Sequence, residues 1–307
     1  MHYTVMKNES IEALNLKNEG VYVDCTLGYA GDSSEILKRV KKGFLFAFDQ
    51  DDEAINYSNE KLSQIGKNYV IIKSNFLYMK ERLQEKGIEK VDGILFDLGV
   101  SSPQLDNDYR GFSYHKDAIL DMRMDTSQEL TAKIVVNTYD EKKLCDIIFR
   151  YGEEKYAKSI ARNIVKEREN KEITTTFELV DIIKKSMPMK ELKKSHPARR
   201  TFQAIRIEVN HELDILPSAL TKALSMLNIG GRMVVITFHS LEDRITKDVF
   251  KSVTDIPDVV KGLPNIPSEY LPDFKIINKK VITPSDNELE ENNRSRSAKL
   301  RIIERVK

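Results

Sequence analysis

The sequence has little of what stabilises secreted or metal-binding proteins. Its 307 residues include only two cysteines, Cys25 and Cys145, which lie far apart in the chain. A disulfide framework is therefore not expected, and a reducing, cytoplasmic location is predicted. The five histidines are scattered without the spacing of metal ligands, so no metal site is predicted.

Long apolar runs and an excess of charge of one sign are also missing. The first sixteen residues carry Lys7, Glu9 and Glu12 and have no long apolar run, so neither a signal peptide nor a membrane span is expected there. The 49 basic and 48 acidic residues leave a net charge of +1. This balance still allows a nucleic-acid partner, because local clustering of charge decides such binding. The length suits one large globular domain or two smaller ones.

Short apolar runs alternate with helical patterns over the first hundred residues. Strands are predicted at 21–25, 44–48, 69–72 and 91–96, with helices at 33–40, 51–62 and 79–86. Continuous apolar runs are typical of buried parallel strands, so the pattern predicts an α/β fold whose sheet is covered on both faces. Strand character returns at 232–237 and again at 299–306.

Between these regions the alternation stops. Residues 101–139 are polar and irregular, and 141–227 are nearly all helical in pattern. The sequence therefore predicts an α/β domain in two parts, 1–105 and 206–307, interrupted by an all-helical insert at 106–205. Residues 254–296, rich in proline and polar side chains, are predicted to form a long loop excursion.

The predicted strand ends carry residues suited to a nucleoside-type cofactor. In open α/β sheets, ligands bind beyond the carboxyl ends of the strands. Gly28 and Gly31 follow the first strand, and Asp49 ends the second at the interval at which an acid accepts hydrogen bonds from ribose hydroxyls. The full phosphate-binding glycine pattern is missing, which favours S-adenosyl-L-methionine over NAD. A tight turn without a ligand is the alternative.

The stretch from Asp97 to Gln104 suits transfer of a group to an exocyclic amine. The N4 lone pair of cytosine is delocalised into its ring, so the amine needs an acceptor for its N–H groups and in-line positioning. Asp97, Ser101 and Ser102 could supply both, and Ser102–Pro103 partly matches a motif of DNA amino-methyltransferases. The alternative is a loop shaped by glycine and proline.

Several short stretches, in this order, resemble the MraW/RsmH family of small-subunit ribosomal RNA methyltransferases. They are 22–28, 97–106, 110–113, 120–125, 151–154, 196–204, 237–244 and 294–301. The resemblance spans the chain from His2 to its end. It implies a Rossmann-like methyltransferase domain with a helical insert, S-adenosylmethionine as cofactor, and N4-methylation of a cytidine in the decoding region of 16S ribosomal RNA.

The resemblance also implies which residues contact the cofactor: Ala30, Gly31, Asp32, Asp49, Phe76, Asp97 and Gln104. Phe76 would pack on the adenine ring, or else is a core residue at a helix start. Asp32 stands where the family usually has histidine. Its carboxylate would either repel the carboxylate of the methionine moiety or bind its ammonium group.

Basic residues concentrate in the predicted insert. Glu191 is the only acid between Lys184 and Arg206, which favours phosphate contact over a merely solvated helix face. The predicted RNA-binding residues are Lys193, Lys194, Arg199, Arg200, Arg206 and, in a second cluster, Arg294 and Arg296. The expected partner is 16S ribosomal RNA or the small ribosomal subunit, and a homodimer is left open.

His239 follows the strand at 232–237 and is predicted to lie beside the substrate as a catalytic residue, with a structural role as the alternative. The chain has no Gly-x-Ser-x-Gly elbow, so His239–Ser240 does not indicate a hydrolase. A non-catalytic, RNA-binding ribosome-assembly factor on the same fold is the second hypothesis, supported only by Asp32. A methyltransferase acting on small molecules or proteins is the third, and the basic insert argues against it.

Overall fold

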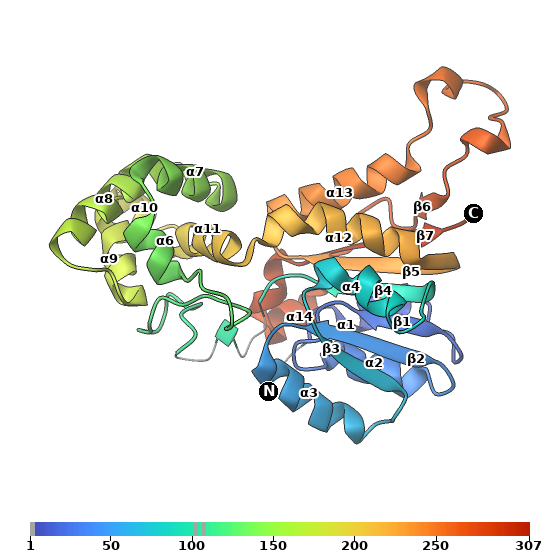
Figure 1. Cartoon of the computed structure of the whole chain (residues 1–307). Helices are drawn as coiled ribbons and strands as arrows, with labels where there is room; N and C mark the ends of the chain where they lie inside the picture. Colours follow the sequence, from blue (N-terminus) through green and yellow to red (C-terminus); the bar gives the residue numbers. More distant parts are fainter. Residues whose placement is uncertain (1–3, 101–103, 106–108) are drawn as a thin grey trace. The chain divides into compact units, whose positions relative to one another are not determined.

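The computed structural model describes residues 4–100, 104–105 and 109–307 (Figure 1). The chain divides into two compact units, Met1–Gly99 with Leu213–Lys307, and Val100–Glu212. The sequence-based boundaries at 105/106 and 205/206 lie a few residues inside the second unit. None of the described helices is long and apolar enough to cross a membrane.

The first unit is built on a seven-stranded sheet. Its order is β3-β2-β1-β4-β5-β7-β6. The first five strands pair in parallel, whereas β7 runs antiparallel to both β5 and β6. The strands are β1 (Val21–Asp24), β2 (Phe44–Asp49), β3 (Tyr69–Lys73), β4 (Val91–Asp97), β5 (Leu227–Thr237), β6 (Phe274–Ile276) and β7 (Lys299–Arg305). The Rossmann-like α/β class predicted from the sequence is confirmed.

Helices cover both faces of this sheet because successive strand residues point to opposite sides. In β4, Leu95 packs in one buried cluster with residues of α1 (Lys7–Ala13), α2 (Gly31–Arg39) and α3 (Asp52–Ser63). Its neighbours Ile94 and Phe96 pack on the other face, in a cluster with residues of α4 (Met79–Gln84), α12 (Glu212–Met226) and α13 (Ser240–Thr254). Figure 1 shows α12 and α13 on one side of the sheet and α2 on the other.

From residue 132 on, the second unit is mainly helical. Its helices are α6 (Ala132–Thr138), α7 (Glu141–Gly152), α8 (Ala157–Asn170), α9 (Thr176–Lys185), α10 (Met189–Leu192) and α11 (Arg199–Asn210). One apolar cluster joins α6, α7, α8, α9 and α11. The close packing of α7 on α11 depends on Gly152, because a Cβ there would lie 2.6 Å from the Arg200 carbonyl oxygen.

The predicted loop excursion contains short elements that the sequence pattern did not show. Besides β6 it holds α14 (Asp286–Glu291) and 3₁₀ turns at Asp258–Val260, Ser268–Tyr270 and Asn293–Ser297. The three residues of β6 are too few to establish an alternating pattern. The edge of β7 supplies their hydrogen-bond partners, so this strand depends on a tertiary contact.

Candidate cofactor-binding site

Three aspartates end neighbouring strands at the same edge of the sheet. Asp24 is the last residue of β1 and lies in register with Leu95 of β4 and Ala47 of β2. Asp49 and Asp97 therefore end their strands two residues further along. This edge is where ligands bind in doubly wound folds, as the sequence predicted.

The turn from β1 to α2 places main-chain groups at this edge. Gly28 has a φ of +48° and Ala30, which is buried and precedes α2, a φ of +53°. Gly31 starts the helix, and a Cβ on it would lie 1.8 Å from the Thr4 Oγ1. The missing side chain of Gly31 therefore serves the packing of Thr4. Packing against Thr4 therefore explains Gly31 without a ligand, as expected if the loop is only a tight turn. Contact between this loop and a cofactor stays a prediction.

The Asp49 carboxylate is oriented by three main-chain amides. Gly28 N donates to its Oδ2 at 2.8 Å, and Gln50 N and Asp51 N donate to its Oδ1 at 2.7 and 2.9 Å. Burial raises the pKa of Asp49, and these hydrogen bonds work in the opposite direction. Because a carboxylate has about four lone-pair sites, one remains to accept a hydrogen bond from a ribose hydroxyl.

Asp24, Asp32 and Asp97 form a group of buried acids that we call the carboxyl cluster. Asp24 accepts hydrogen bonds from Ser33 Oγ at 2.6 Å and Thr26 N at 3.1 Å, and Asp32 accepts one from Ser10 Oγ at 2.8 Å. Burial is the main cause that raises the pKa of Asp24 to about 6.

The two other acids of the cluster are shifted further in the same direction. Burial, followed by the charge of Asp24, raises the pKa of Asp32 to about 7. Burial and then the charges of Asp32 and Asp24 raise the pKa of Asp97 well above its usual range. The cluster therefore resists full ionisation unless positive charge is brought to it.

Asp97 has an unsatisfied atom. Its main-chain amide donates to Thr26 Oγ1 at 2.7 Å, which fixes the end of β4. Its Oδ1 is buried and has no hydrogen-bond partner among the described residues. Leaving such an atom unpaired costs about 1–3 kcal/mol, so a donor is missing from this position. S-adenosylmethionine carries an ammonium and a sulfonium group, and the cluster fits a ligand of that charge.

Phe76 follows β3 in the 3₁₀ turn Phe76–Tyr78. Asn75 starts this turn by accepting a hydrogen bond from Leu77 N, and its side chain also donates to Gln50 Oε1 at 3.0 Å. The Phe76 ring meets the Phe96 ring edge-on, at 5.6 Å between centroids. It is only partly buried, so part of it remains accessible for stacking. Both roles expected from the sequence, packing residue and adenine contact, are compatible with this position.

Of the residues predicted along 101–104, only Gln104 is among the described residues. Gln104 is buried and belongs to the second unit. Ser101 and Ser102 lie outside the described residues, so their catalytic role stays a prediction.

His239 holds the start of α13. Its Nδ1 accepts a hydrogen bond from Glu242 N at 3.4 Å, and the Glu242 carboxylate accepts hydrogen bonds from His239 N and Phe238 N. Its Nε2 lies 3.0 Å from Glu242 Oε1, without hydrogen-bond geometry. This reciprocal cap accounts for the histidine structurally. Its catalytic role stays a prediction.

The basic residues predicted to bind RNA fall into three states. Arg199 and Arg200 lie exposed in the first turn of α11, where the helix dipole already carries partial positive charge. Lys193 is exposed, and Lys194 pairs with Glu191 at 3.0 Å. Arg206 makes two hydrogen bonds of 2.8 Å to Glu212 and is 16% exposed, so its charge is neutralised within the unit. Arg294 and Arg296 are exposed on the 3₁₀ turn at Asn293–Ser297.

Comparison with known proteins gives the family. The model of the MraW methylase family matches residues 1–306. The chain belongs to the MraW methylase family. It is 54% identical over 307 residues to ribosomal RNA small subunit methyltransferase H of Exiguobacterium sibiricum. The matched region covers 100% of this chain and 98% of that relative. The family predicted from the short motifs is thus confirmed.

Two solved structures are similar at a lower level. An rRNA methylase from Streptococcus thermophilus has a TM-score of 0.44 and 12% identity, with 98% of this chain and 94% of that chain covered. A methyltransferase from Streptococcus mutans in complex with SAH has a TM-score of 0.43 and 16% identity, with 99% of each chain covered. Similarity at this level assigns no residue a role.

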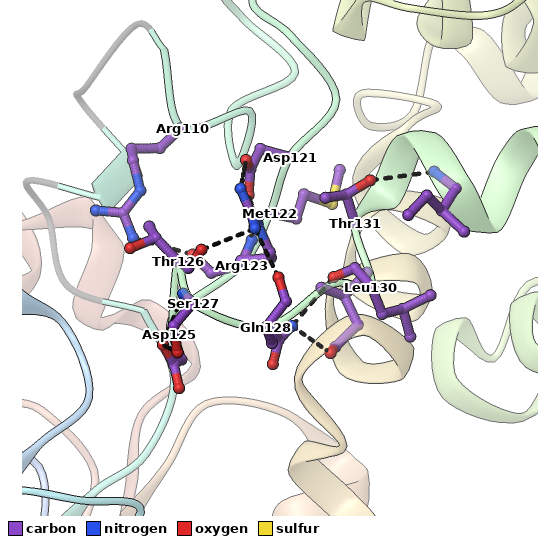
Figure 2. A network of polar contacts seen from close by, with 12 residues as sticks. Arg110, Asp121, Met122, Arg123, Asp125, Thr126, Ser127, Gln128, Leu130 and Thr131 are labelled. Carbon is purple, nitrogen blue, oxygen red and sulfur yellow. Dashed lines mark hydrogen bonds and ion pairs between the residues drawn. The ribbon is translucent and has the colours of Figure 1, made fainter.

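In this MraW methylase, the stretch at 120–125 builds a loop of the second unit (Figure 2). The Arg123 guanidinium donates to Asp121 at 2.9 and 2.8 Å and to the carbonyl oxygens of Thr126 and Gln128. Arg110 donates to the Arg123 carbonyl oxygen at 2.9 Å. Most donors of Arg123 are therefore used inside the loop, and the motif has a structural reason to exist.

Sequence reasoning did not single out Asp24, Ser10 or Thr26 of this methylase as site residues. Asp24 had a signal, because an acid directly after a buried apolar run lies at the ligand-binding edge of a parallel sheet. Ser10 had none, since its contact with Asp32 joins residues 22 positions apart.

Proposed function

We propose that this methylase transfers a methyl group from S-adenosylmethionine to N4 of a cytidine in the decoding region of 16S ribosomal RNA. The observation that carries the proposal is the 54% identity, along the whole chain, with a relative named ribosomal RNA small subunit methyltransferase H. S-adenosylmethionine is the cofactor that membership in a methylase family implies. The N4 atom and the decoding region follow from the resemblance of the motifs.

Each residue at the sheet edge has a task in binding the cofactor. The Asp49 carboxylate, which three main-chain amides orient, accepts a hydrogen bond from a ribose hydroxyl. Phe76 stacks on the adenine ring. The unpaired oxygen of Asp97 accepts a hydrogen bond from the cationic methionine end. The loop Ala30–Asp32 lines the same edge, and Gln104 is the contact predicted from the second unit.

The transfer step depends on positioning of the amine. When bound, S-adenosylmethionine supplies an electrophilic methyl group on its sulfonium. Asp97 and the Ser101–Ser102 stretch orient the cytosine N4 for in-line attack and accept hydrogen bonds from its N–H groups. A raised pKa makes Asp97, once ionised, a better proton acceptor for the N4 proton that leaves.

The RNA is held by the exposed cations. Lys193, Lys194, Arg199 and Arg200 contact phosphates, as do Arg294 and Arg296 in the first unit. The N-terminus of α11, where the helix dipole carries partial positive charge, also favours an anion. Arg206 contributes less, because its charge is matched by Glu212.

Mass spectrometry of ribosomal RNA tests this function. Nucleosides of 16S RNA from cells with and without the gene are compared, and N4-methylcytidine is expected only where the gene is intact. Cells carrying the Asp97→Ala variant serve as a control for the presence of the protein. An unchanged N4-methylcytidine level after deletion would contradict the proposal.

The second hypothesis, a non-catalytic assembly factor, had Asp32 as its only support. The hydrogen bond between Ser10 and Asp32 gives that residue a place inside the fold, so it no longer favours this hypothesis. Calorimetric titration with S-adenosylmethionine separates the two functions, because an assembly factor would bind RNA without binding the cofactor.

A further inference from the structure

The carboxyl cluster holds more negative charge than its surroundings balance. Among the described residues, no cation forms an ion pair with Asp24, Asp32 or Asp97. Three adjacent buried carboxylates cannot all ionise without a counter-charge, because burial and mutual repulsion both oppose it.

The groups around the cluster mostly add to this repulsion. The charge of Lys7 in α1 favours the ionised form of Asp32. The acids that oppose ionisation of the cluster come from four other places: Glu35 of α2, Asp49 at the end of β2, Glu242 of α13 and Glu288 of α14. Burial raises the pKa of Asp24 to about 6, and burial and the charge of Asp24 raise that of Asp32 to about 7. The free protein therefore keeps protons on the cluster near neutral pH.

The hydrogen-bond partners of the cluster suit either protonation state. Ser10 Oγ lies 2.8 Å from Asp32 Oδ1 and Ser33 Oγ 2.6 Å from Asp24 Oδ2. A hydroxyl can donate to a carboxylate or accept from a carboxylic acid, so neither contact must break when a proton leaves. The buried Oδ1 of Asp97 lacks a partner among the described residues, which leaves room for a donor from a ligand.

We propose that Asp24 and Asp32 act with Asp97 to bind the positively charged end of S-adenosylmethionine, and that the cluster gives up protons as this charge enters. The O–H bond of a carboxylic acid breaks, its proton passes to the solvent, and the carboxylate left behind is balanced by the cation of the ligand. Asp24 and Asp32 are thus positioning residues that set cofactor affinity. This inference rests on the proposed function, from which the cofactor follows.

Calorimetry measures the exchange directly. The full-length protein is titrated with S-adenosylmethionine, without RNA, in buffers of different ionisation enthalpy at about pH 6.5. The dependence of the observed heat on the buffer gives the protons released, and we expect about one per cofactor bound. The Kd should fall roughly tenfold between about pH 6 and about pH 7.5. The uncharged ligand 5′-methylthioadenosine, which shares the adenosine, should bind without releasing protons.

Variants on two helices assign the protons. Asp32→Asn keeps the shape but cannot titrate, so proton release should fall by about half or more and cofactor affinity should weaken. Glu60→Gln, an exposed acid of α3 that is not among the groups acting on the cluster, is the control and should leave proton release unchanged. Ser10→Ala removes the hydrogen bond that lowers the pKa of Asp32, so it should move the pH dependence of affinity to higher pH. This variant retains the carboxyl and decides the matter if Asp32→Asn does not fold.

The outcomes separate this inference from the proposed function. Binding of S-adenosylmethionine without proton release would overturn the inference alone, as would equal release with 5′-methylthioadenosine or undiminished release by Asp32→Asn. Failure of the wild-type protein to bind S-adenosylmethionine at all would overturn the proposed function itself.

Discussion

The sheet edge of the first unit and the start of α11 in the second carry opposite charges in opposite surroundings. At the sheet edge, Asp24, Asp32 and Asp97 are held inside the protein with few cations near them. At the start of α11, Arg199 and Arg200 lie exposed to solvent. Buried carboxyl groups suit a small cationic ligand that the protein encloses, whereas exposed arginines suit a polyanion that binds at the surface. The sign of the charge and the burial of the side chains together distinguish the proposed cofactor site from the proposed RNA-binding surface.

The largest effect is expected from Asp97→Ala. Removing the carboxyl takes away both a cofactor contact and the acceptor at the reacting amine, so kcat/KM should fall by about a thousandfold or more. Methyl transfer to small ribosomal subunits measures it, and thermal unfolding checks that the fold is kept. Full activity in this variant would remove Asp97 from the mechanism.

The double variant Arg199→Glu with Arg200→Glu probes the other region. RNA affinity should fall by roughly ten- to a hundredfold, and the slope of log affinity against log salt should become shallower by about one for each phosphate that is no longer bound. Affinity for S-adenosylmethionine should not change. Lys142→Glu, an exposed lysine on α7, is the matched control. An equally large drop in RNA affinity in the control would show that only net charge matters.

The buried acids predict an unusual pH dependence of stability. The pKa values of Asp24 and Asp32 are raised in the folded state to about 6 and about 7, so the folded protein binds more protons than the unfolded chain between about pH 4 and pH 7. Their contribution is present at about pH 4 and is lost as the pH rises through the folded values. Asp32→Asn should therefore stabilise the free protein at about pH 7.5 by about 1–3 kcal/mol, with a smaller gain at about pH 5.

Thermal unfolding at the two pH values checks this prediction. Glu60→Gln should show no such gain at either pH, because this exposed acid of α3 is not among the groups acting on the cluster. Equal stability of wild type and Asp32→Asn at both pH values would mean that the cluster is not strained by charge.

The smallest effect on RNA binding is expected from Arg206→Gln. Its guanidinium is paired with Glu212 through two hydrogen bonds of 2.8 Å, so RNA affinity should change less than about twofold. Removal of this partly buried pair should lower the stability by about 1–2 kcal/mol. Filter binding and chemical denaturation measure the two quantities. A large decrease in RNA affinity at intact stability would place Arg206 with Arg199 and Arg200.

Much of the fold could be predicted from local patterns. Continuous apolar runs located β1 to β4, and the helical pattern over 141–227 located the helices there, because these signals come from residues close together in the chain. β6 was missed, since three residues acquire strand structure only through pairing with β7. His239 caps α13, a role that the Glu three residues later could have indicated, and its catalytic role stays a prediction.

The sequence by itself determined the family, the α/β class and the positions of Asp49 and Asp97 at strand ends, because motif order and strand periodicity are properties of the chain alone. Tertiary structure decided what the side chains face. The Asp32 carboxyl accepts a hydrogen bond from Ser10, Gly31 packs against Thr4, and Asp97 lies in one buried cluster with Asp24 and Asp32, which are far from it in sequence. Burial and mutual repulsion, which set the protonation of such a cluster, exist only once the strands and helices have packed.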